Sequence, residues 1–87
     1  MSEEIEKKLN FIIEAALQGR INLEEFYIRW PSEELDGIEY YDQMYAEIEN
    51  AIEHTPFDLF SKKINDKIWK KTREYKTLLF YKSIIKS

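Results

Sequence analysis

The sequence predicts an all-α fold, a compact antiparallel four-helix bundle built from residues 1–87 as a single domain. Two Gly and two Pro supply few turns for a many-stranded β protein. No period-two alternation of apolar and polar residues continues beyond four residues. Apolar residues instead recur at three- and four-residue steps, the spacing of a helix face. Short connections between these segments favour antiparallel neighbours.

The first predicted helix covers residues 3–18. Ser2 is a plausible N-cap, and the carboxylates that follow it suit the positive end of a helix dipole. A narrow apolar stripe runs along this segment, formed by Ile5, Leu9, Ile12, Ile13 and Ala16. Gly19 follows at the position where a residue with positive φ ends a helix.

The second predicted helix is short, residues 23–30. Asn22 can cap it by accepting from the backbone N–H of Glu25, and Ile21 and Phe26 occupy the two positions of a hydrophobic staple. The proline that follows Trp30 disfavours helical dihedral angles there and ends the helix. Residues 31–37 then form a polar connection.

The third predicted helix, residues 37–53, has two distinct faces. Its apolar stripe consists of Ile38, Tyr41, Met44, Tyr45, Ile48, Ala51 and Ile52. An acidic row consists of Glu39, Asp42, Glu49 and Glu53. At 100° per residue, the centre of the acidic row lies about 130° from the centre of the apolar stripe. We therefore expect one face in the core and a negatively charged face in water.

The last segment allows two readings, a helix that begins near residue 57 with a kink, or a separate helix over residues 66–85. Asn65 or Asp66 could cap the separate helix, and residues 57–64 could form a helical turn. Within the last helix, one line is predicted to contain Ile68, Thr72, Tyr75 and Leu79, with Trp69 and Phe80 beside it.

The composition and charge exclude several classes of protein. The chain has no cysteine, hence no disulfide or thiolate chemistry, no basic and apolar leader, and no apolar run near the ~20 residues that span a bilayer. We expect a cytoplasmic protein with no membrane partner. Residues 1–60 carry 15 Asp/Glu and 4 Lys/Arg, a net charge of −11, whereas residues 61–87 carry 2 and 9, a net charge of +7. Such a polarised molecule can steer a charged partner.

Nothing in the sequence indicates catalysis. The single histidine, His54, lies at a predicted helix end, where its role is structural. No Gly-rich phosphate loop and no pair of histidines at ligand spacing is present. The carboxylates that precede Gly37 lack the spacing of a calcium loop. We expect no enzyme activity, no cofactor and no metal site.

The chain resembles the colicin D immunity family of small helical bacterial proteins, whose members have about this length. The resemblance covers residues 8–85 in the order of the elements. It is carried by a helix that ends in Gly19-Arg20-Ile21, a polar cap, Glu25-Phe26, an aromatic turn to Trp30 and the acidic aromatic helix that follows. It implies a cytoplasmic helical bundle that binds a cognate nuclease toxin and presents carboxylates to the basic cleft of that toxin.

The predicted partner-binding surface comes from the helix faces, since the resemblance transfers no individual contact residue. Its carboxylates can replace phosphates in a basic site and accelerate association. Tyr40, which borders the acidic row, is the expected aromatic anchor. The predicted surface consists of Glu33, Glu34, Asp36, Glu39, Tyr40, Asp42, Glu49 and Glu53.

Two other functions remain open. One is a regulatory or scaffolding module, a monomer or weak homodimer, whose oppositely charged parts associate head to tail. The other is nucleic-acid binding through the basic last helix, where Trp69 and Tyr81 could stack on bases. The overall negative charge opposes this second function. Its cationic residues are Lys67, Lys70, Lys71, Arg73 and Lys76.

Overall fold

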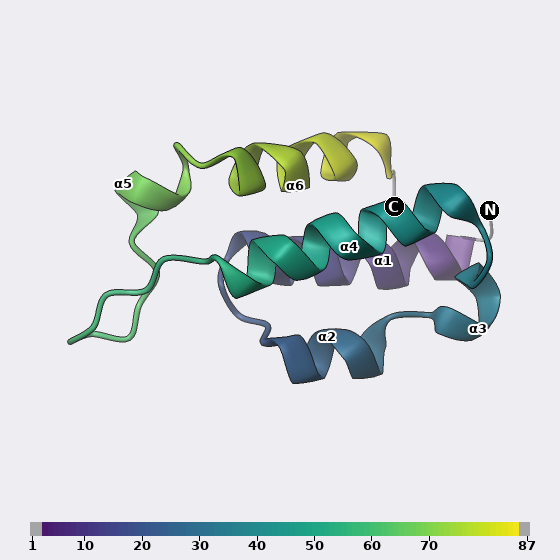
Figure 1. Ribbon diagram of the computed structural model, residues 1–87, viewed down its shortest axis with the longest axis horizontal. Helices are drawn as coiled ribbons and strands as arrows, with labels where there is room; N and C mark the ends of the chain where they lie inside the picture. The colour runs from purple at the N-terminus through teal and green to yellow at the C-terminus, as the bar shows by residue number, and fades with distance from the viewer. Residues whose placement is uncertain (1–2, 86–87) are drawn as a thin grey trace.

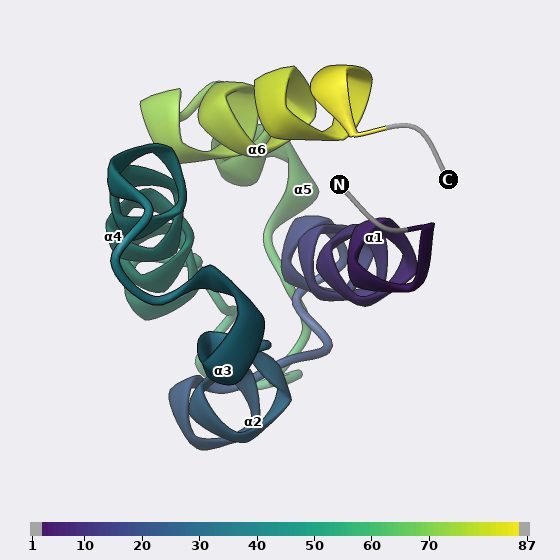
Figure 2. The ribbon, with the colours of Figure 1, turned by 90° about the vertical axis from the view of Figure 1, so that its right-hand side faces the viewer.

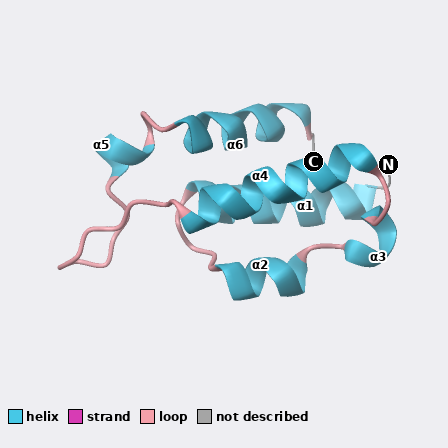
Figure 3. Cartoon of the chain, viewed as in Figure 1, coloured by secondary structure: helices cyan, strands magenta, loops and turns pink. Residues whose placement is uncertain are grey.

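The computed structural model describes residues 3–85 and contains six helices in this range. In chain order they are α1 (Glu3–Leu17), α2 (Leu23–Arg29), α3 (Ser32–Leu35), α4 (Glu39–Glu53), α5 (Asp66–Trp69) and α6 (Arg73–Ile84) (Figure 1). The all-α prediction is confirmed, and the only β pairing among these residues is an isolated bridge (Figure 3). The four-helix arrangement is not confirmed, because the chain forms two further short helices, α3 and α5.

Three long helices surround the core. Seen along the long axis, α1 and α4 lie on either side, α6 crosses over both, and α2 with α3 closes the opposite side (Figure 2). Helix α6 packs on α1 and α4, and α2 also contacts both. The core contains Leu9, Ile12, Ile13, Phe26, Met44, Ile48, Trp69 and Leu78, each fully buried. Among residues 3–85, no helix is both long and apolar enough to cross a bilayer.

Helix α1 ends at Leu17, one residue before the predicted boundary, and a glycine with positive φ follows it. Gly19 has φ 66°, as the sequence predicts. The N–H of Arg20 donates to Ala15 O at 2.9 Å and that of Gly19 to Ala16 O at 3.2 Å, the pair of bonds that defines a Schellman motif. A Cβ at Gly19 would lie 3.1 Å from Ile64 Cδ1 and 3.4 Å from Phe57 Cε1. Residues 57–64, which precede α5, therefore pack against this turn through Phe57 and Ile64.

Gly19→Ala is expected to lower the free energy of unfolding by about 2 kcal/mol, through left-handed strain together with the close approach to Ile64. Gly37→Ala is the matched control. Gly37 also has positive φ, 83°, but a Cβ there would meet nothing within 4 Å. Strain alone then costs about 1 kcal/mol. Urea denaturation followed by circular dichroism measures both, and an equal loss in the two variants would exclude a contribution from the Ile64 contact.

Helix α2 confirms the predicted cap, but the connection after it is partly helical. Asn22 Oδ1 accepts from Glu25 N at 2.8 Å, and Trp30 is extended, with ψ 128°. The sequence predicts an irregular polar connection over residues 31–37. This prediction is wrong for Ser32–Leu35, which form the short helix α3. Leu35 is 3% exposed, so burying this side chain in the core holds the short turn in helical form.

Helix α4 begins at Glu39, two residues after the predicted start, because Gly37 has positive φ and Ile38 is extended, with ψ 107°. Of the predicted apolar stripe, Met44, Ile48, Ala51 and Ile52 are buried and Tyr41 and Tyr45 are partly buried, whereas Ile38 remains 44% exposed. His54 is the C-cap, and its backbone N–H donates to Asn50 O. The face assignment for this helix is confirmed.

The prediction of a continuous helix over residues 66–85 is wrong. The chain breaks between α5 and α6, and Thr72 lies in the break as the N-cap of α6. The Thr72 hydroxyl donates to Trp69 O at 2.7 Å and accepts from Tyr75 N at 3.1 Å, so it satisfies backbone groups on both sides of the break. The break rotates α6 relative to the predicted face. Ile68 and Leu79 are exposed, while the buried residues are Trp69, Leu78, Tyr81 and Ile85.

Residues 57–64 form a projecting hairpin, not the helical turn that the sequence allowed. Phe57 and Ile64 form an isolated antiparallel bridge, and Asp58 N donates to Lys63 O at 2.8 Å. Asp58 Oδ1 accepts from the N–H groups of Phe60 and Ser61 at 2.8 and 3.0 Å, the bonding of an Asx turn. These side-chain bonds compete with helix formation and close the loop without a glycine.

Candidate functional site

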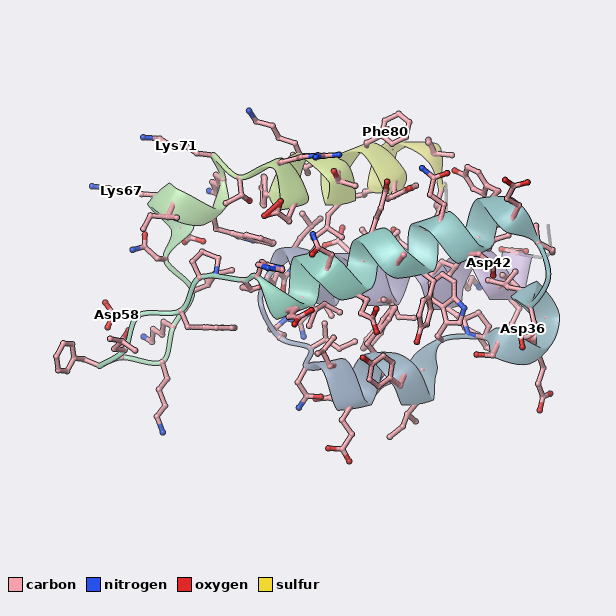
Figure 4. The ribbon with its side chains drawn as sticks, viewed as in Figure 1. Asp36, Asp42, Asp58, Lys67, Lys71 and Phe80 are labelled. Carbon is pink, nitrogen blue, oxygen red and sulfur yellow. The ribbon has the colours of Figure 1, made fainter. Side chains whose placement is uncertain are left out.

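Most of the predicted carboxylates lie at one end of the molecule. Helix α3 and the first turn of α4 bring five of them into ten consecutive residues, Glu33, Glu34, Asp36, Glu39 and Asp42, which we name the acidic end. Figure 4 shows Asp36 and Asp42 together at this end. All five side chains are exposed. Residues 30–61 contain nine Asp/Glu and no Lys or Arg, so the local charge is not balanced along the chain.

The acidic end is poorly neutralised by other parts of the fold. Glu34 Oε1 lies 3.8 Å from Nζ of Lys8, which is on α1, and both side chains are more than 40% exposed. Within residues 3–85, none of the other four carboxylates forms an ion pair. Tyr40 is 45% exposed, and its ring packs edge-on against Tyr41 at 5.1 Å. The acidic end therefore presents a negative field with one accessible aromatic side chain.

Glu49 and Glu53 belong to a different part of the surface. At 1.5 Å per residue, Glu53 lies about 17 Å along α4 from Asp42, beyond the distance at which exposed charges reinforce each other in physiological salt. Glu49 accepts a hydrogen bond from the Tyr27 hydroxyl at 2.6 Å. The predicted surface is therefore divided into the acidic end and a Glu49–Glu53 pair beside α2.

The Tyr27–Glu49 bond has a measurable consequence for titration. The hydrogen bond to this carboxylate, together with desolvation, raises the pKa of Tyr27 to about 12. The protonated phenol is the donor, so the bond stabilises the fold below pH 10 and is lost as the pH rises through about 12. Glu49→Gln removes the negative charge and is expected to move the pKa of Tyr27 down toward its ordinary value of 10.

Carbon-13 NMR of labelled tyrosine rings measures this shift, with Tyr27→Phe to assign the resonance. Glu3→Gln is the control, because Glu3 lies on α1 and forms its ion pair with Lys7. A Tyr27 resonance that titrates identically in the parent protein and in Glu49→Gln would contradict the hydrogen bond as the cause.

An open groove of about 760 Å³ adjoins the acidic end, between α1 and the α2–α3 segment. Its apolar part includes Phe11 and Ile28, which are 47% and 77% exposed. The Arg29 guanidinium lies 4.8 Å from the centre of the Phe11 ring. Glu33 and Glu34 line the same groove. Carboxylates and an apolar surface are thus available to one partner.

The basic surface of the last two helices lacks the expected stacking aromatics. Trp69 is fully buried and donates through Nε1 to Leu17 O at 2.8 Å, and Tyr81 is 4% exposed with its hydroxyl bonded to Glu47. Burial and the bond to this carboxylate raise the pKa of Tyr81. A groove of about 620 Å³ between α4 and α6 contains Lys71, Arg73 and Lys76, and Phe80 is exposed there. The basic residues are also spread over three parts of the chain, with Lys67 on α5, Lys70 and Lys71 in the break, and Arg73 and Lys76 on α6.

Sequence reasoning missed the α1–α2 groove and the tip of the hairpin. Leu59 and Phe60 are 92% and 96% exposed, in a segment for which the sequence left helix, turn and loop open. Asp58 was the available signal, because an aspartate can close a turn through its own side chain. No comparable signal marked the groove, which depends on how α2 packs beside α1.

Among residues 3–85, no group of three or more His, Cys, Asp and Glu is placed to hold a metal ion. Comparisons of the chain with protein-family models, curated proteins and solved structures found no match.

Proposed function

We propose that this chain is a cytoplasmic immunity protein, an inhibitor that binds a cognate bacterial toxin with a basic nuclease domain. The observation that carries the proposal is the acidic end, five exposed carboxylates of which only Glu34 has an ion-pair partner within residues 3–85. In this proposal the protein acts by binding and catalyses no reaction.

The physical basis is mimicry of a polyanion. A nuclease domain holds nucleic acid through Lys and Arg side chains that contact phosphates. A cluster of carboxylates on a folded surface can occupy the same cationic cleft, where complementary charge accelerates association and excludes the substrate. The short spacing of the acidic residues along α3 and α4 suits such a cleft better than carboxylates scattered over the whole surface.

Affinity also needs an apolar contribution, since exposed charge pairs contribute little to binding free energy. The groove that contains Phe11 and Ile28 adjoins Glu33 and Glu34, and Tyr40 is accessible on the first turn of α4. We propose that the acidic end steers the toxin and that these side chains bury apolar surface in the complex. The resemblance to the colicin D immunity family implies carboxylates presented to a basic cleft, which agrees with the steering role of the acidic end.

Head-to-tail association is the second candidate function, favoured by the charge polarity of the molecule. Asp36 and Asp42 lie at one end of a molecule 40 Å long, and Lys67 and Lys71 lie at the other (Figure 4). A scaffolding module could join such ends in successive copies. This association would be strongly weakened by salt, since it depends on exposed charges.

The deciding experiment is a pull-down of the tagged chain co-expressed with the product of its neighbouring gene, at low and at high salt. Capture of a basic nuclease domain, weakened but not abolished by salt, would support an inhibitor that combines steering with apolar contacts. An uncaptured chain that elutes alone as a salt-sensitive oligomer would overturn the immunity proposal in favour of scaffolding.

A further inference from the structure

The hairpin at residues 57–64 projects from the body of the fold (Figure 1), and its turn contains two large apolar residues, Leu59 and Phe60. Leu59 is 92% exposed and Phe60 is 96% exposed. Single exposed apolar residues are common on soluble proteins and need no explanation. Two adjacent ones at the tip of a hydrogen-bonded hairpin are different, because no part of the fold can cover them.

The hairpin holds this tip in a defined position. Asp58 caps the turn through the backbone N–H groups of Phe60 and Ser61, and Lys62 adopts a positive φ of 56° that closes it. At the base, Asn65 N donates to Pro56 O at 2.8 Å. Phe57 and Ile64 pack over Gly19, where no Cβ intervenes. The tip is thus presented outward with little ordering left to occur on binding.

Lysines surround the hairpin and α5. Residues 57–71 contain five lysines, Lys62, Lys63, Lys67, Lys70 and Lys71, against Asp58 and Asp66, for a net charge of +5 − 2 = +3. All five lysines are exposed, and none forms an ion pair within residues 3–85. Figure 4 shows Lys67 and Lys71 at the same end of the molecule as Asp58. The apolar tip is therefore accompanied by an unpaired cationic surface.

We infer that this hairpin docks on an anionic lipid bilayer, with Leu59 and Phe60 inserted at the interface and the lysines beside the headgroups. Apolar side chains of interfacial segments reach about 5–10 Å into the boundary between headgroups and acyl chains. Lysines near an anionic surface add attraction that salt weakens. The sequence predicts no membrane partner, because an apolar run long enough to span a bilayer is the only membrane signal considered there, and a short docking tip gives no such run.

Nucleic acid is the less suitable anionic partner for this tip. A base can stack on Phe60, but Leu59 has no aromatic face and gains only from an apolar environment. Both side chains are also almost fully exposed on a projecting loop, which enters a deformable bilayer more readily than a preformed protein surface. Leu59 is thus the residue that distinguishes lipid from nucleic acid.

Membrane docking leaves the acidic end free. The molecule is 40 Å long, and the carboxylates of the acidic end lie at the opposite end from the hairpin (Figure 4). Charges are screened within about 8 Å at physiological ionic strength, so the acidic end does not repel a bilayer that the hairpin touches. This inference is independent of the proposed inhibitor function.

The test is co-sedimentation of the full chain with vesicles of phosphatidylcholine containing roughly one third phosphatidylglycerol, compared with pure phosphatidylcholine. The parent protein is expected to bind the anionic vesicles and to dissociate as salt rises. The double variant Leu59→Ser with Phe60→Ser is expected to bind more than about tenfold more weakly. Ile84→Ser is the matched control, because Ile84 is 45% exposed at the C-terminal end of α6, which lies away from the hairpin (Figure 1), and this variant is expected to leave vesicle binding unchanged.

Folding is not at risk in the tip variant, since both side chains project almost entirely into solvent. Several outcomes would overturn the inference. These are no binding to anionic vesicles, equal binding by the tip variant, a tip-dependent gel shift with single-stranded RNA or DNA without vesicle binding, or tip-dependent oligomers in light scattering without lipid. Loss of vesicle binding in the tip variant with unchanged capture of a nuclease domain would show that the two surfaces act separately.

Discussion

Replacing Trp69 with alanine is expected to lower the free energy of unfolding by about 3–5 kcal/mol. Trp69 is a fully buried side chain, and its ring packs edge-on against Tyr75 at 5.5 Å. Its indole N–H also joins α5 to the end of α1 by donating to Leu17 O. A domain of this size has only about 5–15 kcal/mol of stability in total, so this substitution removes a large share of it.

Trp69→Phe separates packing from hydrogen bonding. Phenylalanine keeps most of the ring but leaves the Leu17 carbonyl without its donor, which is expected to cost about 1–3 kcal/mol. Phe80→Ala is the control, because Phe80 is largely exposed and its loss is expected to change stability by less than about 0.5 kcal/mol. Urea denaturation followed by far-ultraviolet circular dichroism measures the free energy of unfolding of all three variants. Equal stability of Trp69→Ala and Phe80→Ala would show that α5 does not pack as described.

The parts of the fold that sequence predicted are those governed by local chemistry. The Asn22 cap, the Gly19 turn and the extended Trp30 before proline follow from contacts within a few residues, and each was predicted correctly. The failures depend on distant residues. Periodicity placed Trp69 beside a helical line, whereas its partner is the carbonyl of Leu17, 52 residues away. No local pattern encodes that pairing.

The same distinction applies to the surfaces. The exposure of Glu39 and Asp42 was predictable, because their positions on the helix lie opposite the apolar stripe. The hydrogen bond to Glu49 was not, since its donor is the Tyr27 hydroxyl of another helix. The hairpin tip was missed because Asp58 satisfies backbone groups that a helical turn would have used otherwise.

Reversing Glu39 and Asp42 to lysine is expected to slow association with the basic nuclease domain proposed as partner by about 10–100-fold at low ionic strength. Both carboxylates are exposed and form no ion pair within residues 3–85, so their main effect on a partner is electrostatic. Both also lie in the first turn of α4, where the helix dipole favours negative charge. The double reversal is therefore expected to cost about 1–2 kcal/mol of stability without unfolding the protein.

The matched control reverses Glu4 and Glu24, which lie in the first turns of α1 and α2. Each double variant changes the net charge from −4 to −4 + 4 = 0, and each places two lysines at helix starts. Stopped-flow association kinetics across a salt series then separates local from overall charge. A slower on-rate in the Glu39 and Asp42 variant alone, converging with the control at high salt, identifies the acidic end as the steering surface. Equal on-rates in both variants would assign the steering to net charge and remove the acidic end as the binding site.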